Sequence, residues 1–169
     1  MPNHVKHIMS FDGNTEQVTA LLNFIRSTDD NQFDFDTIIP MPKELAGTQT
    51  HSTPNNALIT KYGFSDWYKW RLACWGTKWG AYDVTLKDDG LHFQTAWSTA
   101  PAIFARLSKM FPKLTINIDY ADEDIGHNYG RLSYLNGIMA KEVIEDPVKF
   151  ACHTWEHDHD EYLEAMQSC

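Results

Sequence analysis

The chain has 169 residues, a size that suits a single α+β domain, residues 1–169, with a real core. An apolar share of 43% and a charged share of 22% are typical of a soluble globular protein, not of a disordered or membrane-spanning one. The net charge is −9, and residues 86–169 carry most of it. An acidic surface repels phosphate backbones, so we expect no nonspecific nucleic-acid binding and no membrane partner.

The cysteines and the N-terminal residues point to a reducing compartment. Residues 1–7 lack the basic and apolar segments of a signal peptide, so we expect a cytoplasmic protein. Cys74, Cys152 and Cys169 lie far apart and form no Cys-x-x-Cys pair. The sequence therefore predicts free thiols and no cysteine-bound cofactor.

The first third of the chain predicts two strands around one helix. Apolar side chains alternate from His4 to Phe11, which indicates a strand. Asn14 stands three residues before Gln17, the spacing of a capping box, and predicts a helix to about Ser27. A polar loop at residues 28–32 and a short strand at residues 33–39 are expected next.

Residues 43–64 are rich in Gly, Ser, Thr, Pro and Asn and predict a long surface loop. After them, a short helix is expected over Asp66–Cys74, followed by a β-hairpin that turns at Asp88-Asp89-Gly90. The return strand places Leu91, Phe93, Thr95 and Trp97 on one face. A helix with Pro101 in its first turn then runs to Phe111.

The last third predicts a strand, a hairpin and a helix. Alternation over residues 114–120 is the clearest strand pattern in the sequence, and an acidic loop follows at 121–128. Asn136-Gly137 predicts a two-residue hairpin turn. Asp146 caps a C-terminal helix, residues 146–169, with a break expected near His157.

These elements predict an α+β fold with a ferredoxin-like antiparallel sheet. Strands joined mainly by hairpins, with helices between them, favour helices packed mainly on one face of such a sheet. The order strand–helix–strand–strand–helix–strand is the split βαβ pattern. We expect an inserted loop and helix segment and an extra C-terminal hairpin and helix around it.

The tryptophans gather in one stretch. Five of the 6 lie between Asp66 and Trp97. Indole rings fill cores and also grip partners, so two interpretations stay open. The rings join the helix to the hairpin, or Trp75, Lys78 and Trp79 form a ligand-binding site that stacks a base or holds a peptide.

Two other groups of residues suggest sites. His153 and His157 are four apart and would share one helix face, where Asp160 lies near enough to complete a zinc or nickel site; the alternative is a solvated helix end. The carboxylates of Asp119, Asp122, Glu123 and Asp124 would form an anionic edge for a partner. No catalytic motif is recognisable, so we expect no catalytic residues and no cofactor.

Six short motifs carry a resemblance to a known family. They are Asn3–Val5, Phe33–Asp36, Ile38–Leu45, Trp75–Trp79, Phe93–Ser98 and Tyr120–Asp124. Together they resemble the YubB-type proteins of bacterial phages, plasmids and integrated elements, over the chain to about Glu145. Gly80, and Thr99-Ala100 before Pro101, depart from the family pattern. The resemblance implies a ferredoxin-like domain and a mobile-element origin, and it carries over no catalytic residue.

Three functions remain as hypotheses. The first is a non-catalytic accessory protein of a mobile element that binds a host protein or complex, in its concrete form an inhibitor of a host defence system acting through an acidic surface. The second is a metal-dependent enzyme or sensor that uses the C-terminal histidines. The third is a module that binds a small ligand or nucleotide with the tryptophan hairpin. The sequence does not define an oligomeric state.

Overall fold

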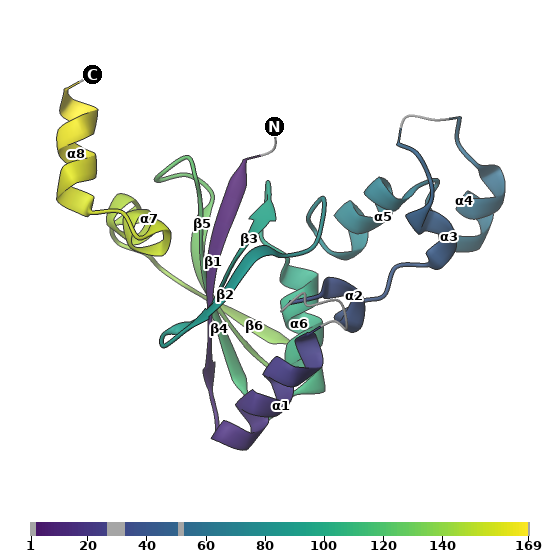
Figure 1. Ribbon diagram of the computed structural model, residues 1–169, viewed down its shortest axis with the longest axis horizontal. Coiled ribbons are helices and arrows are strands. Elements are labelled where there is room, and N and C mark those ends of the chain that lie inside the picture. The colour runs from purple at the N-terminus through teal and green to yellow at the C-terminus, as the bar shows by residue number, and fades with distance from the viewer. Residues whose placement is uncertain (1–2, 27–32, 51–52, 169) are drawn as a thin grey trace.

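The computed structural model describes residues 3–26, 33–50 and 53–168 and contains a six-stranded antiparallel sheet (Figure 1). The strands are β1 His4–Asp12, β2 Tyr82–Lys87, β3 Gly90–Ala96, β4 Thr115–Asp122, β5 Tyr129–Leu135 and β6 Ile138–Glu142. The helices are α1 Thr15–Ile25, α2 Phe35–Ile38, α3 Lys43–Ala46, α4 Asn56–Tyr62, α5 Trp67–Cys74, α6 Pro101–Met110, α7 Pro147–Trp155 and α8 His159–Gln167.

The first four strands have the ferredoxin-like arrangement. The order across the sheet is β2-β3-β1-β4-β5-β6, and every neighbouring pair is antiparallel. The chain passes from β1 through helices to β2, returns by a hairpin to β3, and crosses through α6 to β4, which is the split βαβ pattern. β5 and β6 widen the sheet beside β4. The predicted fold class is confirmed.

The main core lies between the sheet and the helices α1 and α6. Met9, Phe93 and Ile118 point from neighbouring strands into this layer, and each is at most 1% exposed. α6 presents Ile103 and Phe104 to them, both fully buried, at the spacing expected for an amphipathic helix. α7 covers part of the opposite face (Figure 1).

The helix α7 is anchored to that second face by one indole. Trp155 Nε1 donates to the carbonyl oxygens of Ala121 and Asp122 at 3.0 and 2.9 Å. Lys6 Nζ lies 5.8 Å from the centre of the same ring and 2.8 Å from Glu156 Oε2. The helices α1 and α6 therefore lie on one face of the sheet and α7 covers part of the other, while α3, α4 and α5 extend beyond the sheet (Figure 1).

Residues 33–39 are not a strand, so that prediction is wrong. Residues 35–38 form the short helix α2 because the Asp34 side chain accepts a hydrogen bond from Asp36 N at 3.0 Å and caps it. Phe35 and Ile38, three residues apart, both point into the core. The apparent alternation of Phe33 and Phe35 came from two buried rings on either side of a helix cap.

Residues 43–64 do not form one long loop either, because they contain α3 and α4. Asn55 caps α4 through its side chain, and Gly63 ends it in a left-handed conformation, φ +79°. Glu44 joins the two helices by accepting hydrogen bonds from Lys61 and Tyr62, both at 2.7 Å. Residues 51–52, the predicted loop at 28–32, and Cys169 lie outside the described residues.

The remaining boundaries agree closely with the sequence. Asn14 and Asp146 cap α1 and α7 as predicted, each through its side chain. The expected break near His157 is present because Glu156 is left-handed, φ +60°, and separates α7 from α8. The helix α5 begins at Trp67, one residue later than expected, because Asp66 is its cap and accepts a hydrogen bond from Lys69 N at 3.0 Å.

His7 is a titratable group in the middle of the core. It is fully buried, stacks on Phe93 with ring centres 4.6 Å apart, and has Nε2 3.0 Å from Thr99 Oγ1. Phe104 and Tyr120 are its other ring neighbours. Burial lowers the pKa of His7 from 6.5 to about 3, so the imidazole stays neutral in the folded protein.

We expect His7 to make the protein less stable as the pH falls. The unfolded chain binds a proton at this imidazole below about pH 6.5, whereas the folded chain does not until about pH 3. Unfolding therefore takes up a proton in this window, and the free energy of unfolding falls by up to about 1.4 kcal/mol per pH unit from this group. The free energy of unfolding, measured with urea at several pH values, should depend less steeply on pH in His7→Gln than in the wild type. The exposed His153→Gln is the matched control, and equal slopes in all three proteins would contradict the prediction.

Candidate functional site

Trp97 is held out of the core by its backbone. β3 ends at Ala96, and Trp97 follows with φ +69°, a left-handed conformation that bulky residues rarely adopt. Its N–H donates to Asn3 O at 2.9 Å, and its carbonyl accepts from Asn128 Nδ2 at 3.1 Å. The ring is 40% exposed. The expectation that Trp97 shares a strand face with Leu91, Phe93 and Thr95 is therefore wrong.

An aromatic pocket lies beside this ring. Its volume is about 290 Å³. The residues that line it are Thr50, Trp67, Tyr68, Lys78 and Trp97. Tyr68 and Trp97 meet edge to face with ring centres 6.3 Å apart, and Trp67 and Tyr68 do so at 5.8 Å. Three rings from α5 and from the end of β3 thus enclose one hollow.

Lys78 brings a positive charge to the wall of the aromatic pocket. Its ammonium lies 4.6 Å from the centre of the Trp79 ring and 5.1 Å from that of Trp97. Within the described residues it forms no ion pair with a carboxylate. The two ring faces hold the ammonium in place without neutralising it, so the pocket can attract an anionic group.

Hydrogen bonds fix the segment that carries Lys78. Gly76 has φ +88°, which a glycine adopts without strain. Thr77, fully buried, donates to Ala96 O at 2.8 Å and accepts from Ala96 N at 3.2 Å. Ser98 Oγ donates to Gly76 O. The Trp-Gly-Thr-Lys-Trp segment is therefore attached to the end of β3, directly before Trp97.

The structure separates the three residues predicted as a ligand site. Trp75 is 2% exposed, donates from Nε1 to Ile39 O at 2.9 Å, and belongs to the core. Lys78 lines the pocket, whereas Trp79 contacts the Lys78 ammonium without lining the pocket. The sequence interpretation missed Trp67, Tyr68 and Trp97. The adjacent aromatic pair at the first turn of α5 was the available signal.

The predicted anionic edge is only partly exposed. Asp119 accepts two hydrogen bonds from Arg131, both at 2.7 Å, so its charge is paired on the sheet. Asp122 is 5% exposed. Glu123 and Asp124 are exposed, although Glu123 Oε1 also accepts from His4 N at 3.1 Å.

Asp122 is the organising carboxylate of this end of the sheet. Its Oδ1 accepts from Asn3 Nδ2 at 3.1 Å and from Asp124 N at 3.0 Å, and its Oδ2 accepts from Asn128 Nδ2 at 3.1 Å. Asn128 Nδ2 also donates to the carbonyl oxygen of Trp97, and the carbonyl oxygen of Asn3 accepts from the N–H of Trp97. One buried carboxylate thus fixes both residues that hold the Trp97 backbone.

The predicted metal site does not assemble. α7 ends at Trp155, and the left-handed Glu156 redirects the chain, so His153 and His157 do not share a helix face. His157 stacks on Trp155 instead, and Asp160 lies in α8. Within the described ranges, no group of three or more His, Cys, Asp or Glu side chains is placed to hold a metal ion.

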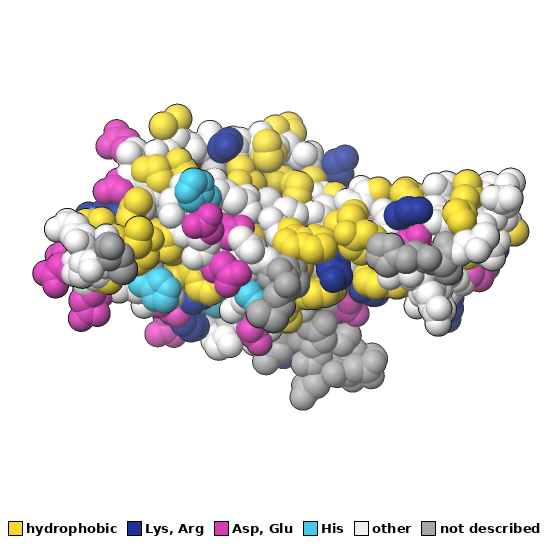
Figure 2. Space-filling model, turned by 90° about the horizontal axis from the view of Figure 1, so that it is seen from above, with side chains coloured by type: hydrophobic (Ala, Val, Ile, Leu, Met, Phe, Trp, Pro, Cys, Tyr) yellow, Lys and Arg dark blue, Asp and Glu magenta, His cyan; other side chains and the backbone are white. Residues whose placement is uncertain are grey.

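Figure 2 looks down on the end of the molecule where β3 and α5 meet. Hydrophobic side chains are gathered in the middle of this face, and acidic side chains are frequent toward the end that carries α7 and α8.

The described helices include none that is long and apolar enough to cross a bilayer.

Residues 74–164 match a protein family described as the ferredoxin-like domain in Api92-like protein. The match covers more than half of the chain. The chain belongs to this Api92-like family. The Api92-like domain starts at Cys74 and so includes Lys78, Trp79 and Trp97, whereas Trp67 and Tyr68 precede it.

The crystal structure of protein Api92 from Yersinia pseudotuberculosis is similar to this chain, with 14% sequence identity and a TM-score of 0.47. The similarity covers 67% of this chain and 40% of that one, so the chain spans two fifths of its length. No curated protein matches the sequence. The family description specifies a fold and no activity, so function must be argued from the site.

The left-handed backbone at Trp97 predicts an unusual order of stability. Trp97→Ala and Trp97→Gly both remove the ring, but only glycine adopts positive φ without strain. We expect the glycine variant to be more stable than the alanine variant by about 1 kcal/mol in urea unfolding. Glu164, exposed within α8, is the control, because there glycine should be the less stable of the two. If the glycine variant is less stable than the alanine variant at position 97 as well, position 97 is not strained.

Asp122 should be necessary for the stability of this end of the sheet. Asp122→Ala leaves Asn3, Asn128 and the amide of Asp124 without their acceptor, and we expect a loss of about 2 kcal/mol. Asp124→Ala removes an exposed carboxylate and should change stability by less than about 0.5 kcal/mol. Urea unfolding measures both, and equal effects would argue against the organising role.

Proposed function

We propose that the protein is a non-catalytic binding protein and that a partner protein docks at the aromatic pocket. The observation that supports this is Trp97, whose ring is exposed at the expense of backbone strain and is fixed by hydrogen bonds on both sides. Strain of this kind is concentrated at functional sites. Tryptophan and tyrosine are also the side chains that contribute most to protein interfaces.

The chemistry of the pocket favours binding over catalysis. Its lining side chains are three aromatic rings, one threonine and one lysine. None of them is a histidine, cysteine or carboxylate that would act as a general base or as a nucleophile of lowered pKa. The rings suit an apolar or aromatic side chain of the partner, and the Lys78 ammonium suits a carboxylate next to it.

The biological setting is part of the same proposal. The YubB-type resemblance supports an accessory protein of a phage, plasmid or integrated element that acts in the cytoplasm on a host macromolecule. Inhibition of a host defence complex is its concrete form. The exposed Glu123 and Asp124 would then lie at the rim of the contact, where charge steers the approach of a basic surface more than it adds affinity.

A small anionic ligand is a second candidate for the same pocket. The volume of about 290 Å³ is close to the lower end of ligand pockets, which begin at roughly 300 Å³. A flat ring stacked on one of the lining rings, with its anionic group at Lys78, would use both the aromatic surface and the positive charge of the pocket. Quenching of tryptophan fluorescence by nucleoside monophosphates would favour this candidate.

The partner proposal is tested by capture from a bacterial host lysate with the tagged protein as bait. We expect Trp97→Ala to reduce recovery of a specific partner by about tenfold or more, because an interface centred on one aromatic anchor depends on it. Lys78→Gln should weaken the capture and reduce its dependence on salt.

The matched control is Met166→Ala, which truncates another exposed apolar side chain, in α8. Its recovery should equal that of the wild type. If both Trp97→Ala and Lys78→Gln recover the partner as well as the wild type does, the contact lies elsewhere on the protein and the proposal is contradicted.

A further inference from the structure

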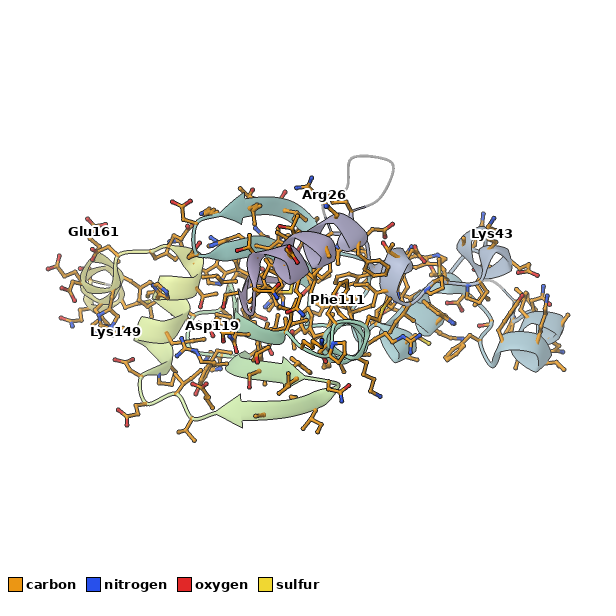
Figure 3. All side chains as sticks on the ribbon, turned by 90° about the horizontal axis from the view of Figure 1, so that it is seen from below. Arg26, Lys43, Phe111, Asp119, Lys149 and Glu161 are labelled. Carbon is orange, nitrogen blue, oxygen red and sulfur yellow. The ribbon has the colours of Figure 1, made fainter. Side chains whose placement is uncertain are left out.

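The strand β6 forms an open edge of the sheet. It pairs with β5 over five residue pairs, from Leu135–Ile138 to Arg131–Glu142, without a register shift. All five of its residues are exposed, and Ile138 is 75% exposed. In Figure 3, β6 is the outermost strand, and no described element lies beyond it. An edge of this kind offers unpaired backbone groups to another strand.

The turn before β6 shows which backbone groups are free. Asn136 and Gly137 both have positive φ, +49° and +79°, so they form the two-residue turn that closes on the Leu135–Ile138 pair. In an antiparallel ladder, hydrogen-bonded and non-hydrogen-bonded pairs alternate along the strands. The N–H and C=O groups of Met139 and Lys141 therefore point away from β5, toward solvent.

Two lysines flank an apolar side chain along this edge. Met139 and Lys141 are opposite Tyr134 and Leu132, so they share the sheet face on which α6 lies. The side chain of Lys109, from α6, lies against the turn. Its Cε is 2.3 Å from the position that a Cβ atom on Gly137 would occupy. On this face the edge therefore presents Lys109, Met139 and Lys141 in order.

These cations have no acidic partner in the structure. Within the described residues, neither Lys109 nor Lys141 forms an ion pair with a carboxylate. In a chain of net charge −9, two unpaired cations on one face of this edge are a local exception, whereas Glu142 on the other face lies 3.9 Å from Arg131. Opposite charges that face each other across two strands stabilise the pairing.

The other edge of the sheet differs. β2 has an irregular register between Tyr82 and Thr85, where Asp83 is left-handed with φ +50°. A bulge of this kind is a known protection against edge pairing. Lys87 at the end of β2 is also paired with Glu156. Of the two edges of the sheet, as far as the described residues show, β6 alone combines a regular ladder with unpaired cations.

We propose that β6 binds an extended acidic segment of a partner protein, which adds a strand to the sheet. On the face shared with α6 the segment would carry carboxylates opposite Lys141 and near Lys109, with an apolar side chain opposite Met139. The required pattern is acidic–x–apolar–x–acidic, because side chains on one face of a strand recur at every second residue. Main-chain hydrogen bonds to Met139 and Lys141 supply the affinity, and the alternating side chains supply the specificity.

A second copy of the chain that pairs symmetrically about Met139 fits this edge less well than an acidic segment. If two β6 strands paired antiparallel about Met139, Lys141 of each copy would face Gly137 of the other, where Lys109 lies. This places like charges together on both sides of the axis. The proposal therefore commits to a partner segment, and self-association is one outcome of the test.

The test uses the full chain and fluorescently labelled peptides with a Glu-Val-Leu-Val-Glu centre, followed by anisotropy. A peptide with a Lys-Val-Leu-Val-Lys centre is the matched control. We expect the acidic peptide to bind about tenfold more tightly than the basic one at low salt, because two exposed charge pairs are exchanged for two repulsive contacts. Equal affinities, or no saturable binding of the acidic peptide, would overturn the proposal.

Two variants separate the contributions of charge and backbone. Lys109→Glu with Lys141→Glu should reverse the preference, so that the basic peptide binds more tightly. Met139→Pro removes an outward N–H and should abolish binding of both peptides. Its circular dichroism spectrum, and its capture of a partner through the aromatic pocket, should stay as in the wild type. Retained binding in Met139→Pro would show that no strand is added. Trp97→Ala should bind the acidic peptide like the wild type, so failure here and failure at the pocket are distinguishable.

Self-association is measured on the same proteins by sedimentation. The wild type is expected to remain at one concentration-independent mass, and the peptide should still bind. A concentration-dependent dimer that Met139→Pro removes would show that the edge is occupied by a second copy and would overturn the proposal.

Discussion

The end of the sheet that carries the candidate site depends on one buried carboxylate. Asp122 stands at the last position of β4 and accepts hydrogen bonds from Asn3, before β1, and from Asn128, before β5. The same two asparagines hold Trp97 through its N–H and its carbonyl oxygen. A buried charge is costly unless donors surround it, and here the donors come from segments far apart in the sequence. Satisfying this one group therefore fixes the chain on both sides of the exposed ring, so that the strained backbone at position 97 is determined by its surroundings.

The tryptophans divide into two groups, and the division explains how a core-forming stretch also supplies a surface. Trp70 and Trp75 are at most 7% exposed and meet edge to face with ring centres 5.6 Å apart, beneath α5. Trp67 begins the same helix but faces the pocket. Because residues three and four apart share a helix face, Trp67 and Trp70 would be expected on one side. Arg71 instead lies between the pocket group and the buried group, since its guanidinium is 5.1 Å from the Trp67 ring and 4.8 Å from the Trp75 ring. The buried rings set the rigid floor on which the exposed rings are presented.

Local patterns were sufficient for the sheet and insufficient for the site. Alternation predicted β1 and β4, and Asn136-Gly137 predicted the β5–β6 hairpin, because a strand face and a two-residue turn are properties of neighbouring residues. The strand expected at residues 33–39 failed because a single side chain, Asp34, capped a short helix there. The site was harder still. Trp97 leaves the strand face through hydrogen bonds to residues far along the chain, and Asp119 loses its free charge to Arg131 across a strand pair. Neither effect is visible in the residues next to them.

The net charge of the protein describes its two candidate surfaces poorly. An overall value of −9 suggests that the protein acts through its carboxylates, yet many of these are already occupied: Asp119 by Arg131, Glu44 by Lys61, and Glu156 by Lys6 and Lys87. Among the described residues, the lysines that form no ion pair with a carboxylate include Lys78 in the aromatic pocket and Lys109 and Lys141 at the β6 edge. A free cation in an acidic protein lies in a field that is negative at long range and positive at contact. If the two surfaces bind as proposed, the protein repels polyanions at a distance, because they sense the whole charge, but accepts a short segment whose few carboxylates meet these lysines directly. Under the two proposals, selectivity for short acidic protein segments over nucleic acid follows from how the charges are paired, and not from their sum.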